Sequence, residues 1–254
     1  MRVLKVMAVV LFGAVIVLMG AAYFASEPRP EGEPGPAADA LASKMEAAIH
    51  KDAWDRTGAV KWSFFDKHHY VWDRTRGVVE ARWGETRVLL RTADKSGLVW
   101  NTDGAVTGDE ATSALDSAYK YWINDSFWLN PAAKLRDPGV VLSVVAEEDG
   151  QEGLLVSYGS GGVTPGDAYL WNVDPDGLPV RWRMWVSIIP IGGLSVTWEN
   201  WVELSTGALI ATEHEGGGRM MTFISDLAGA ETLTDLEGVD PAMFEPLFEQ
   251  PAEP

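Results

Sequence analysis

The segment VRWRMWV, residues 180–186, decides the fold of this chain. Trp182 and Met184 alternate along it with Arg181 and Arg183. Successive side chains of a β-strand point to opposite faces, so this alternation gives one apolar face and one face that meets water. Strands with one solvated face are typical of antiparallel sheets. The segment therefore predicts a β-rich protein in which Trp182 points into whatever the sheet encloses.

Alternation with the same period of two recurs along most of the chain. Connections rich in Gly, Asp and Pro, such as residues 174–177, separate these segments and favour antiparallel hairpins. The predicted strands cover residues 60–64, 69–73, 78–83, 86–92, 97–101, 140–146, 153–158, 167–173, 180–186, 196–204, 208–214 and 219–225.

Two segments near the ends of this strand region follow the helical period instead. After Pro36, apolar residues recur at helical spacing and predict an amphipathic helix to about Lys51, with His50 on its surface. Near the C-terminus, Asp240-Pro241 predicts the start of a short helix that docks through an apolar face. That face consists of Met243, Phe244, Leu247 and Phe248.

A further helix interrupts the strands. Thr107 and Glu110 form a capping-box pattern, an apolar stripe follows, and Asn130-Pro131 ends the segment. An antiparallel sheet of about 10–12 strands must curl, and amphipathic helices need an apolar surface to cover. We therefore expect a mainly β fold of the α+β class. It is a curved antiparallel sheet or open half-barrel of about 10–12 strands, covered on its concave face by two or three helices.

The N-terminus predicts a membrane anchor. Arg2 and Lys5 precede residues 6–24, an uncharged apolar run that as a helix would span roughly 28 Å of hydrocarbon. We expect one N-terminal transmembrane helix, with the rest of the chain on the extracytoplasmic (periplasmic) side of a bacterial envelope. The alternative is a cleaved signal peptide, for which Gly20 and Ala22 supply small residues.

The composition supports three parts. Residues 1–25 form the anchor or signal segment, and residues 26–37, which are rich in Pro, Gly and Glu, form a tether. Residues 38–254 form a single extracytoplasmic β-rich domain with a C-terminal tail. The 254 residues carry a formal charge of −17, which repels phosphate backbones and argues against nucleic acid as a partner. The chain has no cysteine, which excludes thiolate chemistry, Cys-based metal sites and an acylated lipoprotein cysteine.

Three segments suggest a family resemblance. They are WSFFDKHHYVWDR (62–74), YWINDSFWLNPAAKLRDPG (121–139) and GGVTPGDAYLWNVDPDG (161–177). Together with the order of elements, they resemble an uncharacterised group of bacterial exported proteins whose architecture is similar to the lipoprotein carriers LolA and LolB. The resemblance covers about residues 38–228. It implies an unclosed antiparallel barrel with helices as a lid over an apolar cavity that accepts acyl chains.

Aromatic residues supply the candidate ligand-binding positions. The chain has 12 Trp, 6 Tyr and 8 Phe, and such side chains fill cores or line apolar pockets. Residues 122 and 127–129 lie at the end of the predicted central helix and in the loop that would close over the sheet, and two further tryptophans lie on inward strand faces. The candidate cavity residues are Trp122, Phe127, Trp128, Leu129, Trp182 and Trp198.

We expect no cofactor or metal. A site formed by His69, Asp73 and His214 is conceivable, but no tight ligand spacing supports it, and Asp73 can instead pair with Arg74 or Arg76. Calcium at Asp167, Asp174 and Asp176 is conceivable as well, but residues 174–177 are typical of a hairpin turn. No GxSxG elbow, phosphate loop or dinucleotide fingerprint is present.

These observations favour one function over two others. We expect a membrane-tethered extracytoplasmic binding protein that holds a lipid or other apolar small molecule, such as an acyl chain, between the sheet and its helices. One alternative is an envelope hydrolase or glycan-acting enzyme with Asp and Trp on the concave face. The other is a structural or interaction module of the cell envelope, whose acidic surface selects a basic partner.

Overall fold

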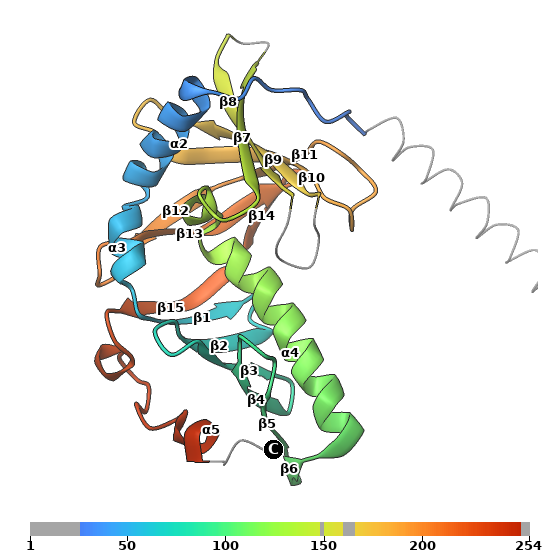
Figure 1. Cartoon of the computed structure of the whole chain (residues 1–254), viewed down its shortest axis with the longest axis vertical. Coiled ribbons are helices and arrows are strands. Elements are labelled where there is room, and N and C mark those ends of the chain that lie inside the picture. The colour runs from blue at the N-terminus through green and yellow to red at the C-terminus, as the bar shows by residue number, and fades with distance from the viewer. Residues whose placement is uncertain (1–25, 148–149, 160–165, 250–254) are drawn as a thin grey trace, which may run out of the picture.

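The computed structural model describes residues 26–147, 150–159 and 166–249. Its strands form two antiparallel sheets, one 7-stranded and one 8-stranded, stacked along the long axis of the molecule (Figure 1). The expected mainly β, antiparallel class is confirmed, whereas the expectation of one continuous sheet is wrong.

The first sheet has the strand order β15-β1-β2-β3-β4-β5-β6. From β1 to β6, neighbouring strands are joined by short turns, whereas β15 comes from far along the chain. Val60, Trp62 and Phe64 of β1 share one buried face, as the alternation predicts. The strands are β1 (Ala59–Phe64), β2 (His68–Asp73), β3 (Val78–Trp83), β4 (Thr86–Arg91), β5 (Gly97–Asn101), β6 (Gly104–Val106) and β15 (Ile224–Ala230).

The second sheet has the order β12-β13-β11-β10-β9-β8-β7, with β14 paired to β13. Residues 180–185 lie in β10, whose Trp182 and Met184 are buried on the inner face. The strands are β7 (Val140–Ala146), β8 (Glu152–Tyr158), β9 (Ala168–Val173), β10 (Pro179–Trp185), β11 (Leu194–Thr197), β12 (Glu199–Glu203), β13 (Leu209–Gly216) and β14 (Arg219–Thr222).

Phe223 marks the point where the chain passes from one sheet to the other. Its backbone N–H donates to the Thr212 carbonyl at 3.0 Å, and its own carbonyl accepts from the Phe65 N–H at 2.9 Å. The predicted strand 219–225 is thereby divided between β14 in the second sheet and β15 in the first. The two sheets are separate ladders that share this residue, which explains why the one-sheet expectation is wrong.

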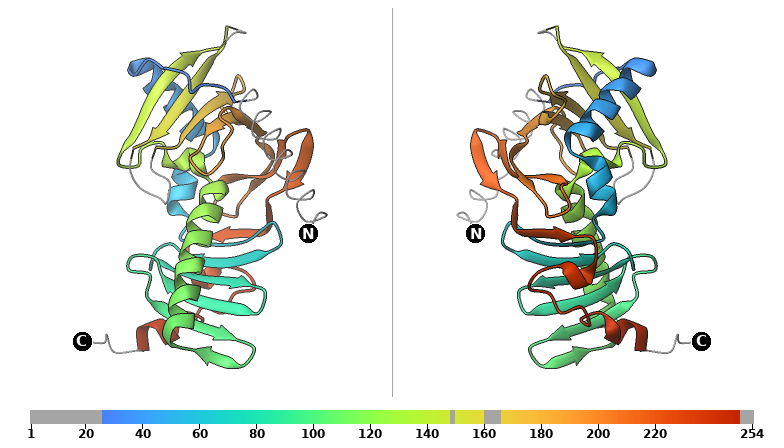
Figure 2. Two further views of the ribbon diagram at one scale, coloured as in Figure 1. Left: turned by 90° about the vertical axis from the view of Figure 1, so that its right-hand side faces the viewer. Right: turned by 90° about the vertical axis from the view of Figure 1, so that its left-hand side faces the viewer.

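The central helix α4 (Gly108–Leu129) connects the two sheets. It packs against β4 and β5 of the first sheet and against β13 of the second, and Figure 2 shows it running along one face of the lower sheet. Asn130-Pro131 ends it as predicted, and a short 3-10 turn, Pro131–Lys134, follows. Thr107 is the N-cap residue, but its side chain makes no capping hydrogen bond, so the capping box does not form.

The predicted N-terminal helix is divided in two. Helix α2 (Pro36–Ala48) packs against β7 and β8, and α3 (Lys51–Arg56) follows after a turn. His50 lies in that turn with a left-handed φ of 54°, not on a helix surface as expected. Its Nδ1–H donates to the Gly207 carbonyl at 2.7 Å, which attaches the turn to the second sheet.

The C-terminal segment covers the face of the first sheet opposite α4 (Figure 2). It contains a 3-10 turn (Leu233–Asp235) and helix α5 (Glu245–Glu249), which is shorter than the predicted helix. Phe244 and Leu247 are buried against this sheet, so the predicted docking is confirmed for these two side chains, whereas Phe248 stays exposed.

The N-terminal expectations fall partly outside the described residues. The predicted anchor, residues 6–24, lies there, and among the described residues no helix is long and apolar enough to cross a membrane. The first part of the predicted tether lies against the second sheet. There the Glu27 N–H donates to the Gly192 carbonyl at 2.9 Å, and Glu33 forms an isolated antiparallel bridge with Val144.

Candidate functional site

An aromatic cluster fills the space between the inner face of the second sheet and the C-terminal end of α4. Trp182 of β10 lies at its centre, with ring centroids 4.7 Å from Trp171, 4.9 Å from Trp198 and 5.0 Å from Trp128. Rings at such separations contact one another directly. We define the aromatic cluster by its members: Phe127, Trp128, Tyr169, Trp171, Trp182, Trp198, His214 and Phe223.

Four of the six candidate cavity residues come together in this cluster. They are Phe127, Trp128, Trp182 and Trp198. Trp122 lies about one and a half turns of α4 before Phe127 and Trp128. The centroid of its ring is 5.3 Å from that of Trp72 in the first sheet. Leu129 is buried with the same group of side chains as Trp122. All four predicted helix residues belong to α4 itself, not to a loop after it.

The cluster contains polar nitrogen atoms that have no hydrogen-bond partner among the described residues. They are the indole Nε1 atoms of Trp171, Trp182 and Trp198 and the Nε2 atom of His214. All four side chains are buried. A buried indole N–H usually finds an acceptor, because an unpaired buried polar group costs about 1–3 kcal/mol. The aromatic cluster is therefore apolar apart from these four nitrogens, with which a bound water or ligand could form hydrogen bonds.

The protonation of His214 fixes what its free nitrogen can do. Nδ1 lies 2.8 Å from the Thr197 carbonyl, an acceptor, so Nδ1 carries the proton. Burial lowers the pKa of His214 to about 4, against smaller opposing effects of the Thr197 bond and of Glu199. The ring is neutral at pH 7, and its Nε2 is an acceptor. The cluster thus offers indole donors beside one imidazole acceptor, a combination that suits a hydroxyl or a protonated carboxyl group.

Four members of the cluster were not among the candidate cavity residues: Tyr169, Trp171, His214 and Phe223. The sequence carries a signal for the first three. Tyr169 and Trp171 alternate with Ala168 and Leu170 along β9, so period-two counting places both rings on one face. His214 shares its strand face with Ile210 by the same count. Which of the two faces is the inner one follows from the pairing of β9 with β10, where Trp171 lies opposite Trp182.

The hypothetical metal sites do not assemble. His69 and Asp73 belong to the outer face of the first sheet, whereas His214 lies in the aromatic cluster. Asp73 pairs with Arg76 at 2.7 Å, one of the two pairings expected for it. Asp174 accepts the backbone N–H groups of residues 176 and 178 at 2.9 and 2.8 Å, which confirms the predicted hairpin turn. Among the described residues, no group of three His, Asp or Glu side chains could hold a metal ion.

A second polar feature connects α4 to the first sheet. The buried carboxylate of Asp125 accepts from His68 Nδ1 at 2.6 Å and from the Tyr70 hydroxyl at 2.7 Å. Burial and the neighbouring Asp125 raise the pKa of Tyr70 far above its usual value, so the hydroxyl stays protonated and donates. No sequence pattern predicts this network, because Asp125 occupies an ordinary position on an amphipathic helix.

We expect Asp125→Asn to lower the free energy of unfolding by about 2 kcal/mol, because an amide oxygen still accepts but loses the charge-assisted bonds. Asp116→Asn, an exposed carboxylate on the same helix, is the matched control and should change it by less than about 0.5 kcal/mol. Urea denaturation followed by circular dichroism measures both. Equal effects would show that Asp125 does not hold α4 to β2.

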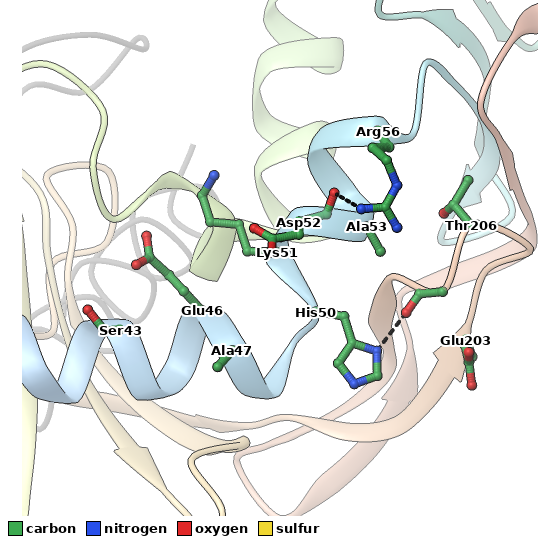
Figure 3. A pocket seen from close by; sticks show the side chains of 11 residues that line it. Ser43, Glu46, Ala47, His50, Lys51, Asp52, Ala53, Arg56, Glu203 and Thr206 are labelled. Carbon is green, nitrogen blue, oxygen red and sulfur yellow. Dashed lines mark hydrogen bonds between the residues drawn. The ribbon is translucent and has the colours of Figure 1, made fainter.

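Separate from the cluster, a surface pocket of about 620 Å³ lies between α2, α3 and the turn that precedes β13 (Figure 3). Its lining is polar and of mixed charge, with Glu46, Lys51 and Arg56 on the helices and Glu203 opposite them. None of the sequence candidates lines it. A shallow charged hollow of this kind does not suit an apolar ligand.

The fold and site define a class, a mainly β protein with two antiparallel sheets and an aromatic interior crossed by one helix. No protein-family model matches the sequence, and no curated protein matches it. Among solved structures, a DUF1329 family protein from Desulfovibrio piger is similar at a TM-score of 0.40. The two are 13% identical, and the alignment covers 86% of this chain and 100% of that chain.

Proposed function

We propose that this chain is a membrane-tethered extracytoplasmic protein that binds a lipid or other apolar ligand within the aromatic cluster. The observation that supports this most directly is the set of unpartnered buried nitrogens on Trp171, Trp182, Trp198 and His214. Four such nitrogens lie in this one cluster, against two, on Trp62 and Trp122, in the core of the first sheet, and each one costs stability. A small-molecule site combines an apolar lining with a few convergent polar atoms.

The chemistry of the cluster selects an amphiphile. Aromatic rings from both α4 and the second sheet favour an acyl chain or another apolar body, at about 25 cal/mol per Å² of buried apolar surface. The indole donors and the His214 acceptor favour a single polar end that both donates and accepts a hydrogen bond. A fatty acid in its protonated form, or a long-chain alcohol, meets both requirements.

Access would involve the last turn of α4. Phe127 and Trp128 are the only members of the aromatic cluster on this helix, and both are partly exposed. The helix ends at Asn130, and the chain continues in a 3-10 turn. Movement of these two rings would open a path to Trp182 and Trp198 without separating any strand pair. The expected anchor and tether would hold the site near a membrane from which such a ligand could come.

The test uses the full chain in non-ionic detergent and cis-parinaric acid, a fluorescent fatty acid, as the probe. We expect saturable binding to the parent protein. Trp198→Phe keeps a ring but removes one unpartnered N–H, and should weaken binding about fivefold, the worth of about 1 kcal/mol. Trp62→Phe removes an equally unpartnered indole N–H from the first sheet and should leave the affinity unchanged.

Two results would contradict the proposal. One is the absence of saturable parinaric acid binding together with the absence of any co-purifying amphiphile in mass spectrometry of the extracted protein. The other is an equal effect of Trp198→Phe and Trp62→Phe, which would place the probe outside the aromatic cluster.

A further inference from the structure

The outer face of the first sheet carries a pocket of about 470 Å³ that the proposed function does not use. Side chains at alternate positions of β1, β2, β3 and β4 form its floor, and residues 238–243 of the C-terminal segment form one wall. That wall is held in place because Phe244 and Leu247 are buried against the same sheet. Packed side chains therefore fix the position of the pocket wall relative to its floor.

Its acidic groups are already bonded within the protein. Both oxygens of the buried Glu80 are held, with Arg82 at 2.8 Å and Arg87 at 2.5 Å. Asp226 accepts from the Ser63 hydroxyl at 2.9 Å, and Asp240 accepts from the backbone N–H of residue 242 at 2.9 Å. Glu80 is thus neutralised by its two arginines, whereas Asp226 and Asp240 keep their negative charge but are exposed to solvent.

The floor of the pocket carries three cations, on Lys61, Arg82 and Arg87, against the one buried carboxylate of Glu80. Lys61 lines the pocket, and among the described residues no carboxylate lies within ion-pair distance of its ammonium group. Each guanidinium has five N–H donors, so Arg82 and Arg87 keep some after binding Glu80. Over the whole pocket the exposed Asp226 and Asp240 balance these charges, but on its floor positive charge exceeds negative charge.

A chain of hydrogen bonds links three further polar side chains of the pocket, those of His69, Ser63 and Asp226. Because the Ser63 hydroxyl donates to Asp226, it accepts from His69 Nδ1, which lies 2.7 Å away. The Nε2 atom of His69 is then left for a partner from outside. Asp226 has a left-handed φ of 50° in an irregular stretch of the β1–β15 pairing, where a bulge turns its carboxylate toward Ser63. This order of groups is not a catalytic triad, because the serine lies between the acid and the histidine.

The pocket also has an apolar part. Val71 of the floor and Val239 and Met243 of the wall line it beside the charged groups. Its volume lies within the range of about 300–1,000 Å³ that small organic ligands occupy. A ligand that fits must therefore bring an anionic group for Lys61 and the two arginines and an apolar body for the wall.

We propose that this pocket is a second binding site, and that it takes a small organic carboxylate. The carboxylate lies against Lys61 and the free N–H groups of Arg82, and the apolar body contacts Met243. The site is independent of the aromatic cluster, since it occupies the opposite face of the first sheet from α4.

The test uses the full chain in non-ionic detergent, labelled with 13C at the methionine methyl groups, and benzoate as the probe. Met243 is the reporter because it lines the pocket wall. We expect benzoate to shift the Met243 methyl signal saturably, and the same concentrations of benzyl alcohol or benzylammonium to leave it unshifted. Lys61→Gln should raise the benzoate Kd at least fivefold, and Lys67→Gln, an exposed lysine outside the pocket, should not change it.

Three outcomes would overturn the proposal. Benzoate could leave the Met243 signal unshifted, benzylammonium could shift it equally, or Lys61→Gln could match Lys67→Gln. Trp198→Phe separates the two sites, because it should weaken parinaric acid binding and leave benzoate binding unchanged. Loss of benzoate binding in Trp198→Phe, without loss in Lys61→Gln, would place the probe in the aromatic cluster and refute the second site.

Discussion

Trp182→Ala is expected to lower the free energy of unfolding by about 4 kcal/mol, the largest effect of any single substitution considered for this chain. The side chain is 0% exposed and contacts five other aromatic rings. Its removal loses the buried ring area and leaves a cavity that the surrounding tryptophans cannot close. Urea denaturation of the full chain, followed by far-ultraviolet circular dichroism, measures the loss.

The same strand supplies the matched control. Trp185 lies three residues further along β10 on the outer face, where it is partly exposed and its indole N–H donates to the Glu27 carbonyl at 2.9 Å. Trp185→Ala should cost about half as much or less, because part of that ring already meets water. If both substitutions cost the same, the inner face of the second sheet would not be the packed side.

Added indole distinguishes a cavity from general loosening of the fold. A molecule that binds only the folded state stabilises it in proportion to the logarithm of its concentration. Indole has the shape of the missing side chain, so it should raise the Tm of Trp182→Ala and leave that of the parent unchanged. A variant that does not respond to indole would indicate that the aromatic cluster rearranges when Trp182 is removed.

How far the sequence predicts the fold depends on the range of the interactions that define each element. Ten of the twelve predicted strands each coincide with one observed strand to within two residues, because the patterns and turns that define them are local. The predicted strand 196–204 is divided at Trp198 into β11, which pairs with β10, and β12, which pairs with β13. The division at Phe223 depends on backbone bonds to residues 65 and 212, which no local pattern reveals.

The candidate site shows the same division between local and distant information. Alternation places Trp182 and Trp198 on inner faces, and the helical stripe places Phe127 and Trp128 near them. Alternation cannot show that His214, which comes from a later strand, packs against Trp198 with the two ring centroids 4.6 Å apart. It also cannot show which buried donors lack partners, because that depends on every neighbour in the folded state.

His214 is expected to make stability depend on pH in a defined window. The unfolded chain binds a proton at this residue near pH 6.5, whereas burial among Trp128, Trp198 and Phe223 lowers the pKa in the folded state to about 4. Above pH 6.5 the contribution is fully present. As the pH falls from 6.5 to 4, the unfolded state binds a proton at His214 that the folded state does not bind, so the free energy of unfolding falls. At about 1.36 kcal/mol per pH unit, the loss approaches about 3 kcal/mol.

Other carboxylates titrate in the same range, so the measurement is a difference between variants. His214→Asn keeps a donor for the Thr197 carbonyl but cannot titrate, and its unfolding free energy should fall less between pH 7 and pH 4 than that of the parent, by about 3 kcal/mol. His50→Asn is the control, since His50 also donates from Nδ1 to a backbone carbonyl but is exposed. Parallel curves for the parent and His214→Asn would show that His214 is not buried as a neutral ring. In that case its Nε2 would not be the acceptor on which an amphiphile with a donor at its polar end depends.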